Sequence, residues 1–211
     1  MKKIIIFGAS GNTGKHIVNE AYKAGFKVTV VISNTEISTF NKSFVTVIVG
    51  DVFQPESYEN ALKKNDVVIS CLELKRRNPD PVYSTGITNI IQSMQKTGLT
   101  RLICLSSHYT RFSKITAFIS KICVLNIIKQ LFQECYSDSL MLEKILCSSN
   151  LNWTVVCPSK LENGLKRGYY RTSINENLTK PTSLNRNDLA DYIIYYMDEE
   201  KTFKSMVQIS Y

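Results

Sequence analysis

The amino-acid sequence predicts one α/β domain with a doubly wound parallel sheet and flanking helices. Three observations support this prediction. Short apolar runs alternate with helical patterns, the first run leads directly into a glycine-rich turn, and a length of 211 residues suits one domain with a sizeable core. No repeat, low-complexity tract or linker divides the chain, so residues 1–211 are expected to fold as a single unit.

Runs rich in Val, Ile and Leu give the predicted strands. They are Lys3–Phe7, Lys27–Ile32, Val45–Val49, Asp66–Leu72, Arg101–Ser106 and Asn152–Cys157, with a last short strand near Met206–Ile209. Helical patterns lie between them, at about 13–24, 56–63, 82–97, 136–149 and 186–198. Gly25 stands where the first helix would need a C-terminal cap. Apolar strands that alternate with helices are typical of a parallel sheet covered on both faces.

Two segments interrupt this alternation. Residues 109–135 contain an apolar stretch, 115–132, which is expected to pack as one or two helices over the ligand edge of the sheet; a membrane-surface or dimer contact is the alternative. Lys121 and Lys129 would lie inside a membrane span, so no span is expected. Residues 158–184 have few apolar runs and are expected to form a lid over the site.

Composition narrows the class of protein. Hydrophobic residues make up 44% and charged residues 21%, which is ordinary for a soluble globular protein. The apolar run at the N-terminus is too short for a signal peptide, and the six cysteines form no C-x-x-C pair, so we expect buried, reduced thiols and a cytoplasmic location. We also expect a monomer or a weak homodimer.

The net charge of +8 raises the question of nucleic-acid binding. The basic residues are scattered, however, and the only short cluster is Lys75, Arg76 and Arg77. A basic rim around a site for phosphorylated ligands explains the charge equally well. Nucleic acid is therefore not an expected partner, and neither a metal nor a metal-ligand cluster is expected.

The glycine turn predicts a dinucleotide site. Gly8 permits a tight turn after the first strand, Gly11 lets the backbone approach a pyrophosphate, and Gly14 lets the helix pack closely on the strand. The spacing is G-x-x-G-x-x-G. The N–H groups of the first helical turn would face the phosphates. The whole turn is predicted to contact the cofactor: Gly8, Ala9, Ser10, Gly11, Asn12, Thr13 and Gly14.

Ligands of open α/β sheets bind outside the carboxyl ends of the strands, where the strand order reverses. Asp51 follows the third strand, where its carboxylate can accept from an adenine amino group; the alternative is a turn cap. Ser107 ends the fifth strand, where nicotinamide or substrate would lie; the alternative is a hydroxyl that satisfies a strand-end backbone group. The other expected contacts at these strand ends are Ser33, Val52, Cys71, Leu72, Ser106, Pro158 and Ser159.

Several motifs resemble one known family in order along nearly the whole chain. The sequence is similar to the atypical short-chain dehydrogenase/reductases that bind NAD(P)H, in particular the group around biliverdin reductase B, also called flavin reductase, and its bacterial relatives. This likeness implies a Rossmann-like fold. The matching stretches are residues 6–14, Val49–Val52, Ser106–Ser107, Tyr136–Asp138 with Glu143, Leu151–Pro158, Leu161–Gly164 with Gly168–Arg171, and Asn185–Asp191.

The resemblance also implies roles for individual residues. It places the pyrophosphate against Ser10 to Thr13, the adenine near Asp51 and Val52, and the nicotinamide near Leu72, Ser106 and Ser107. Pro158 and Ser159 would form the far wall. Ser107 matches the serine that is usually proposed to assist catalysis by orienting cofactor and substrate.

Two departures from the family affect cofactor and substrate. Many relatives have an arginine just after the second strand for the 2′-phosphate of NADP, whereas this chain has Ser33 there and no carboxylate for the ribose of NAD. NADPH is favoured over NADH, because hydroxyls and a basic balance tolerate a phosphate. Lys160 replaces a histidine of the mammalian enzyme, and it is expected to be a charge at the pocket mouth.

The chain also lacks the Tyr-x-x-x-Lys pair that protonates a developing alkoxide in ordinary short-chain dehydrogenases: Ser113 lies four residues after Tyr109, and Leu140 lies four after Tyr136. The sequence therefore predicts hydride transfer from nicotinamide to a planar conjugated acceptor of the flavin, tetrapyrrole or quinone type. His108, next to Ser107, is expected to be a solvent-facing residue rather than a proton donor. The alternative function is an NmrA-like NAD(P) sensor without catalysis, and isomerase-like chemistry is disfavoured.

Overall fold

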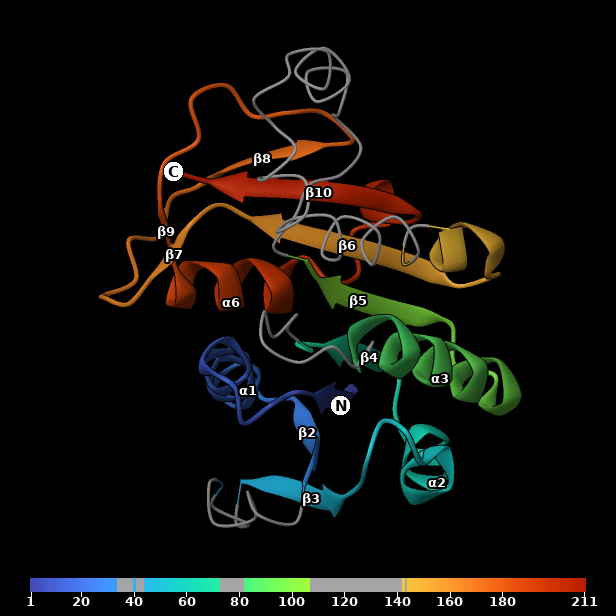
Figure 1. The fold of residues 1–211 in the computed structure, drawn as a ribbon. Coiled ribbons are helices and arrows are strands. Elements are labelled where there is room, and N and C mark those ends of the chain that lie inside the picture. Colours follow the sequence, from blue (N-terminus) through green and yellow to red (C-terminus); the bar gives the residue numbers. More distant parts are fainter. Residues whose placement is uncertain (34–39, 41–43, 73–81, 107–141, 143) are drawn as a thin grey trace, which may run out of the picture.

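The computed structural model describes residues 1–33, 40, 44–72, 82–106, 142 and 144–211, and all elements below lie within them. Its main feature is an eight-stranded sheet with the order β3-β2-β1-β4-β5-β6-β10-β8 (Figure 1). The strands are β1 (Lys3–Phe7), β2 (Lys27–Ile32), β3 (Val45–Val49), β4 (Val67–Ser70), β5 (Arg101–Leu105), β6 (Asn152–Pro158), β8 (Arg171–Ile174) and β10 (Ser205–Ser210). The order 3-2-1-4-5-6 is that of a doubly wound Rossmann-like sheet, as predicted.

Strand pairing fixes the point where the order reverses. β1 pairs in parallel with β2 on one side, where Phe7 lies opposite Val31, and with β4 on the other, where Phe7 lies opposite Ser70. All further pairs through β10 are parallel, and only β8 runs antiparallel at the edge. The carboxyl end of β1 is therefore the switch point at which open α/β sheets bind their ligands.

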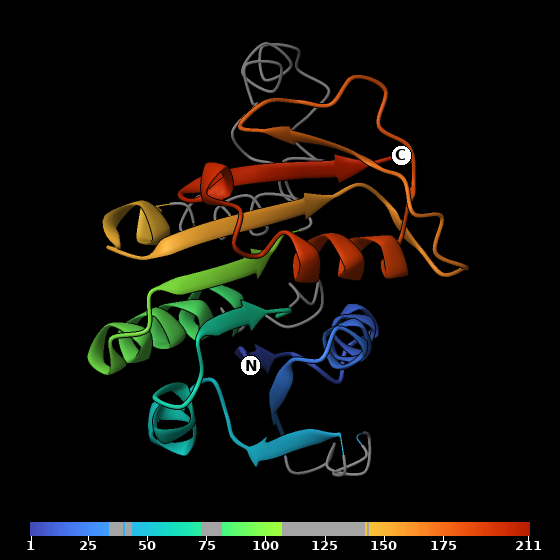
Figure 2. The same cartoon turned by 180° about the vertical axis from the view of Figure 1, so that it is seen from behind.

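Helices cover both faces of the sheet. One face carries α1 (Asn12–Lys23) and α6 (Arg186–Tyr195), and the other carries α2 (Glu59–Leu62) and α3 (Val82–Thr97), as Figures 1 and 2 show from opposite sides. Alternate residues of each strand divide between two cores: Ile4 and Ile6 pack on the α1 and α6 side, and Ile5 and Phe7 pack on the α3 side. This alternation explains why the strands are apolar throughout.

The end of α1 agrees with the sequence. Gly25 has a φ of +81°, its N–H donates to the Tyr22 carbonyl at 2.9 Å, and the Phe26 N–H donates to the Ala21 carbonyl at 3.1 Å. These two bonds form a Schellman cap, which favours glycine at this position. α1 therefore ends one residue before its predicted limit.

Other boundaries differ from the prediction. The helix expected at 56–63 is a 3₁₀ turn, η2 (Pro55–Ser57), followed by the short α2, because Pro55 can start a turn but cannot donate a hydrogen bond. A second 3₁₀ turn, η5 (Glu200–Thr202), precedes β10. Residues 144–148 are helical, as expected for part of 136–149. The expected cover at 109–135 lies outside the described residues.

The expected lid, 158–184, contains secondary structure that the sequence did not predict. Leu161–Glu162 (β7) pairs with Leu184–Asn185 (β9) in a small parallel ladder, and β8 extends the main sheet. The covering role of this segment stays a prediction. No helix in the described part of the chain is both long and apolar enough to cross a membrane.

The cysteine prediction is right for three residues and wrong for one. Cys71, Cys104 and Cys157 are buried thiols, whereas Cys147 is exposed in the last turn before β6. Burial raises the pKa of the Cys104 thiol to about 12, so it stays protonated. Cys123 and Cys135 lie outside the described residues.

Candidate functional site

The glycine turn lies at the switch point and is held there by close backbone packing. Gly8 has a φ of +69°, and a Cβ on it would lie 2.6 Å from the carbonyl oxygen of Cys71. A Cβ on Gly14 would lie 2.7 Å from the Cα of Ala9. Both glycines are therefore required by the protein itself, since no side chain fits at either place.

Gly11 differs from the other two glycines. Its φ of −64° and ψ of 164° are open to any residue, and a Cβ would meet only the Gly8 oxygen, at 3.3 Å. Gly11 is the N-cap of α1 and has no side chain with which to cap the helix, and the first turn carries no acidic residue. The amides of this turn, which have no acceptor within the helix, are thus available to an anion.

Asp51 lies two residues after β3, as expected, and its carboxylate can both cap the turn and bind an adenine amino group. One carboxylate oxygen, Oδ1, accepts from the Phe53 N–H at 2.9 Å, which is the turn cap that was the alternative. The N–H of Asp51 donates to the Ser57 hydroxyl at 3.1 Å. Among the described residues no group donates to Oδ2, so that oxygen can accept from a ligand.

The neighbouring loop is fixed by α3. The carbonyl oxygen of Val52 accepts from the side-chain amide of Asn89 at 3.0 Å. A Cβ on Gly86 would lie 3.1 Å from Val52 and 3.2 Å from Leu72, so Gly86 lets two predicted contact residues approach the helix. The sequence analysis missed Gly86, although a glycine inside a predicted helix is a signal of close packing.

The nicotinamide side of the predicted site is made by β4, β5 and β6. Cys71 and Ser106 are buried directly after their strands, and the Ser106 N–H donates to the Val156 carbonyl at 3.0 Å. Ser159 is fixed by its own N–H, which donates to Ile209 at 3.0 Å. Its hydroxyl oxygen is buried and has no hydrogen-bond partner among the described residues. A buried orphan hydroxyl suits a site that a polar ligand completes.

Other predicted residues are less informative. Ser33 is exposed one residue after β2. Lys160 is exposed and forms an ion pair with Glu162 at 3.7 Å. Ser107 and His108 lie outside the described residues, as do Lys75, Arg76 and Arg77. The structure thus brings the glycine turn, Ser33, Asp51, Val52, Cys71, Leu72, Ser106, Pro158 and Ser159 to the carboxyl ends of adjacent strands. No cluster of three metal-ligating side chains occurs in the described part of the chain.

Sequence comparison identifies the family. The sequence model of a family described as NAD(P)H-binding matches residues 8–200. The chain belongs to this NAD(P)H-binding family. The open glycine turn and the orphan hydroxyl fit such a cofactor, and the family is oxidoreductase-like.

Similar proteins agree with the family and the fold. Eugenol synthase 1 of Petunia hybrida is 38% identical over 77 residues, which cover 32% of this chain but only 25% of that protein. The crystal structure described as ChuY, an anaerobillin reductase from Escherichia coli O157:H7, has a TM-score of 0.77 at 17% identity, with 99% of this chain and 97% of that one covered. A short-chain dehydrogenase/reductase of Veillonella parvula in complex with NADP has a TM-score of 0.74 at 16% identity, covering 100% and 94%. The structural likenesses show a Rossmann-like fold.

Proposed function

We propose that the protein is an NAD(P)H-dependent reductase that transfers hydride from nicotinamide to a planar conjugated acceptor of the flavin, tetrapyrrole or quinone type. The observation that carries the proposal is the glycine turn at the switch point, where a Cβ on Gly11 would meet only the Gly8 oxygen and Gly11 has no side chain to cap the amides of α1. Membership of the NAD(P)H-binding family names the cofactor class that this turn would hold.

The residues divide by the part of the cofactor that each would hold. The amides of residues 12–14 suit the pyrophosphate, since the Gly11 N–H already donates to the Gly8 carbonyl at 3.2 Å, and the second carboxylate oxygen of Asp51 suits the adenine amino group. Ser33 would lie beside the ribose 2′ position. Cys71, Leu72, Ser106, Pro158 and the orphan Ser159 hydroxyl would surround the nicotinamide. The Ser33 hydroxyl and the net charge of +8 support NADPH over NADH.

The chain's own contribution to the reaction would be positional. A reduced nicotinamide supplies a hydride, so the acceptor gains two electrons and one proton. Because the sequence has no Tyr-x-x-x-Lys acid, we propose an acceptor whose ring delocalises the negative charge and takes its proton from water. Ser107 would hold acceptor and nicotinamide in register, and proximity would supply most of the rate enhancement. Residues 109–135 and 158–184 would cover the site.

The decisive experiment is an NADPH-oxidation assay with FMN, riboflavin, biliverdin and quinones as acceptors, with cofactor binding measured in parallel. We expect turnover with at least one of them, and we expect Ser107→Ala to lower kcat about tenfold or more while the Kd for NADPH changes little. The control is Ser148→Ala, since among the described residues Ser148 bonds only to its own helix turn, at the Ile145 carbonyl.

Binding of NADPH without turnover on any acceptor would overturn the reductase proposal and favour the sensor. A sensor would then discriminate strongly between the oxidised and reduced forms, or between NAD and NADP. In either case we propose a cytoplasmic monomer or weak homodimer with a small-molecule ligand.

A further inference from the structure

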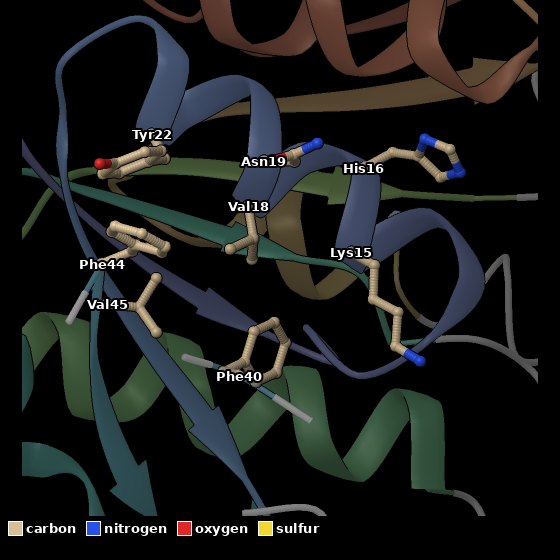
Figure 3. Close-up of a pocket in the computed structure, with 8 residues that line it drawn as sticks. All are labelled: Lys15, His16, Val18, Asn19, Tyr22, Phe40, Phe44 and Val45. Atoms are coloured by element: carbon tan, nitrogen blue, oxygen red, sulfur yellow. The ribbon is translucent and has the colours of Figure 1, made fainter. Parts of the chain in front are cut away.

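A pocket lies along the side of α1, between this helix and the start of β3. It has a volume of about 340 Å³, within the roughly 300–1,000 Å³ range of small-molecule sites. Its helical wall is formed by Lys15, Val18, Asn19 and Tyr22, which are spaced three or four residues apart and so form one stripe along the helix (Figure 3). The pocket therefore follows the flank of α1 from its first turn to its last.

The opposite wall comes from residues before and at the start of β3. Phe40 and Val45 pack against the core, and Phe44 lies beside Tyr22 with ring centroids 4.7 Å apart (Figure 3). Tyr22 and Phe44 are 43% and 49% exposed. One end of the pocket thus presents two half-exposed aromatic rings. Stacking of another flat apolar group on these rings would bury apolar surface and so favour binding.

The other end of the pocket is cationic. Lys15 is exposed, and no carboxylate within the described ranges forms an ion pair with it. The side chain of Val18 lies between the lysine and the aromatic pair (Figure 3). His16 also lines the pocket, but its Nδ1 is within 2.8 Å of the Asn187 amide oxygen, so that nitrogen is already used.

The spacing of the two ends sets the size of a ligand. Lys15 and Tyr22 are seven residues apart, which corresponds to about 10 Å along a helix at 1.5 Å per residue. A bicyclic aromatic ring with one carboxylate spans a similar length. We propose that this pocket binds a planar aromatic carboxylate, with the ring against Tyr22 and Phe44 and the carboxylate against Lys15.

This site is separate from the proposed cofactor site. A pyrophosphate would bind at the amides of residues 12–14, whereas the pocket extends to Tyr22 and Phe44, and Phe44 and Val45 lie where β3 begins. That position is the opposite end of the strand from Asp51. A ligand in the pocket and a dinucleotide would share only the helix between them.

The test is titration of the full-length protein with 2-naphthoate, followed by ligand-observed NMR and calorimetry, with and without saturating NADPH. We expect saturable binding that persists with NADPH present, and binding about tenfold weaker for the neutral 2-naphthamide and for Lys15→Gln. Lys23→Gln, at an exposed lysine of the last turn of α1, is the matched control and should bind as the wild type does. Phe44→Ala should also weaken 2-naphthoate binding.

Absence of 2-naphthoate binding at millimolar concentration would overturn the proposal. Competition by NADPH would also overturn it, because the pocket would then belong to the cofactor site. Equal 2-naphthoate affinity of Lys15→Gln and wild type would show that Lys15 does not bind the carboxylate, and this result would also overturn the proposal. None of these outcomes depends on whether the protein reduces an acceptor.

Discussion

Gly11 and Gly14 have different physical reasons for being glycine. A Cβ on Gly14 would press on backbone atoms of Ala9, whereas a Cβ on Gly11 would meet one oxygen at 3.3 Å and otherwise point into open space. Overpacking of this kind costs about 1–3 kcal/mol, and more when only backbone can move. Gly14 is thus required for packing of the fold, whereas Gly11 is required only if a ligand approaches the backbone there.

We therefore predict opposite outcomes for two variants. Gly14→Ala should lower the melting temperature by about 5 °C or more, since each kcal/mol corresponds to roughly 2–4 °C for a chain of this size. Gly11→Ala should fold with a melting temperature within about 3 °C of wild type and bind NADPH about tenfold or more weakly. Thermal unfolding and calorimetry separate the two effects. Unchanged NADPH affinity in Gly11→Ala would place the pyrophosphate elsewhere.

Ser33 tests the choice of cofactor. If it lies beside the ribose 2′ position, Ser33→Arg should tighten NADPH binding by roughly 1.5–3 kcal/mol, about tenfold or more, through a charge-assisted bidentate contact. NADH has no 2′-phosphate and should gain little. Ser33→Asp should weaken NADPH binding and spare NADH. If both variants keep the NADPH/NADH affinity ratio within about twofold of wild type, Ser33 is not at the 2′ position.

At the scale of elements, α6 anchors the segment that precedes it. Asp188, in the first turn of α6, is completely buried. Its carboxylate accepts from the Gly168 N–H at 2.8 Å, from the Arg167 N–H at 3.0 Å, and from the Tyr211 hydroxyl. Burial and the nearby Asp188 charge raise the pKa of Tyr211 to about 12, so its hydroxyl remains a donor throughout the neutral range.

Removing the charge at this anchor should destabilise the protein. Asp188→Asn replaces one acceptor oxygen by an amide donor that faces other donors, at a cost of about 2 kcal/mol, or a melting temperature about 4–8 °C lower. Asp198→Asn is the matched control, because its ion pair with Lys2 is largely exposed and should contribute little. A fall in Asp188→Asn no larger than in the control would show that these hydrogen bonds add little to stability.

A strand could be predicted from the sequence when its own residues carry the signal, and was missed when only its contacts with distant residues define it. β1 to β6 were predicted because each is a local run of apolar residues, and all of them except the edge strand β3 are buried on both faces. β8 was missed because Arg171–Ile174 is partly polar and lies at the sheet edge, so only its pairing with β10 defines it. The pocket beside α1 was missed for a similar reason: it requires Phe40 and Phe44 to meet a helix from another part of the chain.

The candidate site was easier to predict than the contacts of residues 158–184, because the carboxyl ends of parallel strands all lie at the same edge of the sheet. Once the strand ends were placed, the glycine turn, Asp51 and Ser106 had to lie near one another. Contacts such as those of Asp188 with residues 167 and 168 join segments about 20 residues apart without any periodic signal. These hydrogen bonds form because the partners are buried together in the folded chain, and the sequence alone does not reveal which residues are buried together.

For the whole molecule, the relevant quantity is charge. The chain has 26 Lys and Arg against 18 Asp and Glu, which gives a net charge of +8. A positive field should speed the arrival of anionic ligands, and salt should weaken this effect because the Debye length falls from about 30 Å at 0.01 M to about 10 Å at 0.1 M.

This field should act on NADPH more than on NADH, since the 2′-phosphate adds negative charge to an otherwise identical ligand. We predict that raising NaCl from about 0.01 M to about 0.1 M slows NADPH association severalfold and slows NADH association less, with small changes in either dissociation rate. Stopped-flow measurement of nicotinamide fluorescence gives both rates, and NADH is the internal control. Equal salt dependence for the two cofactors would mean that the scattered basic residues produce no net attraction at the cofactor site. The basic balance would then lose its weight as an argument for NADPH, and the preference would rest on Ser33 alone.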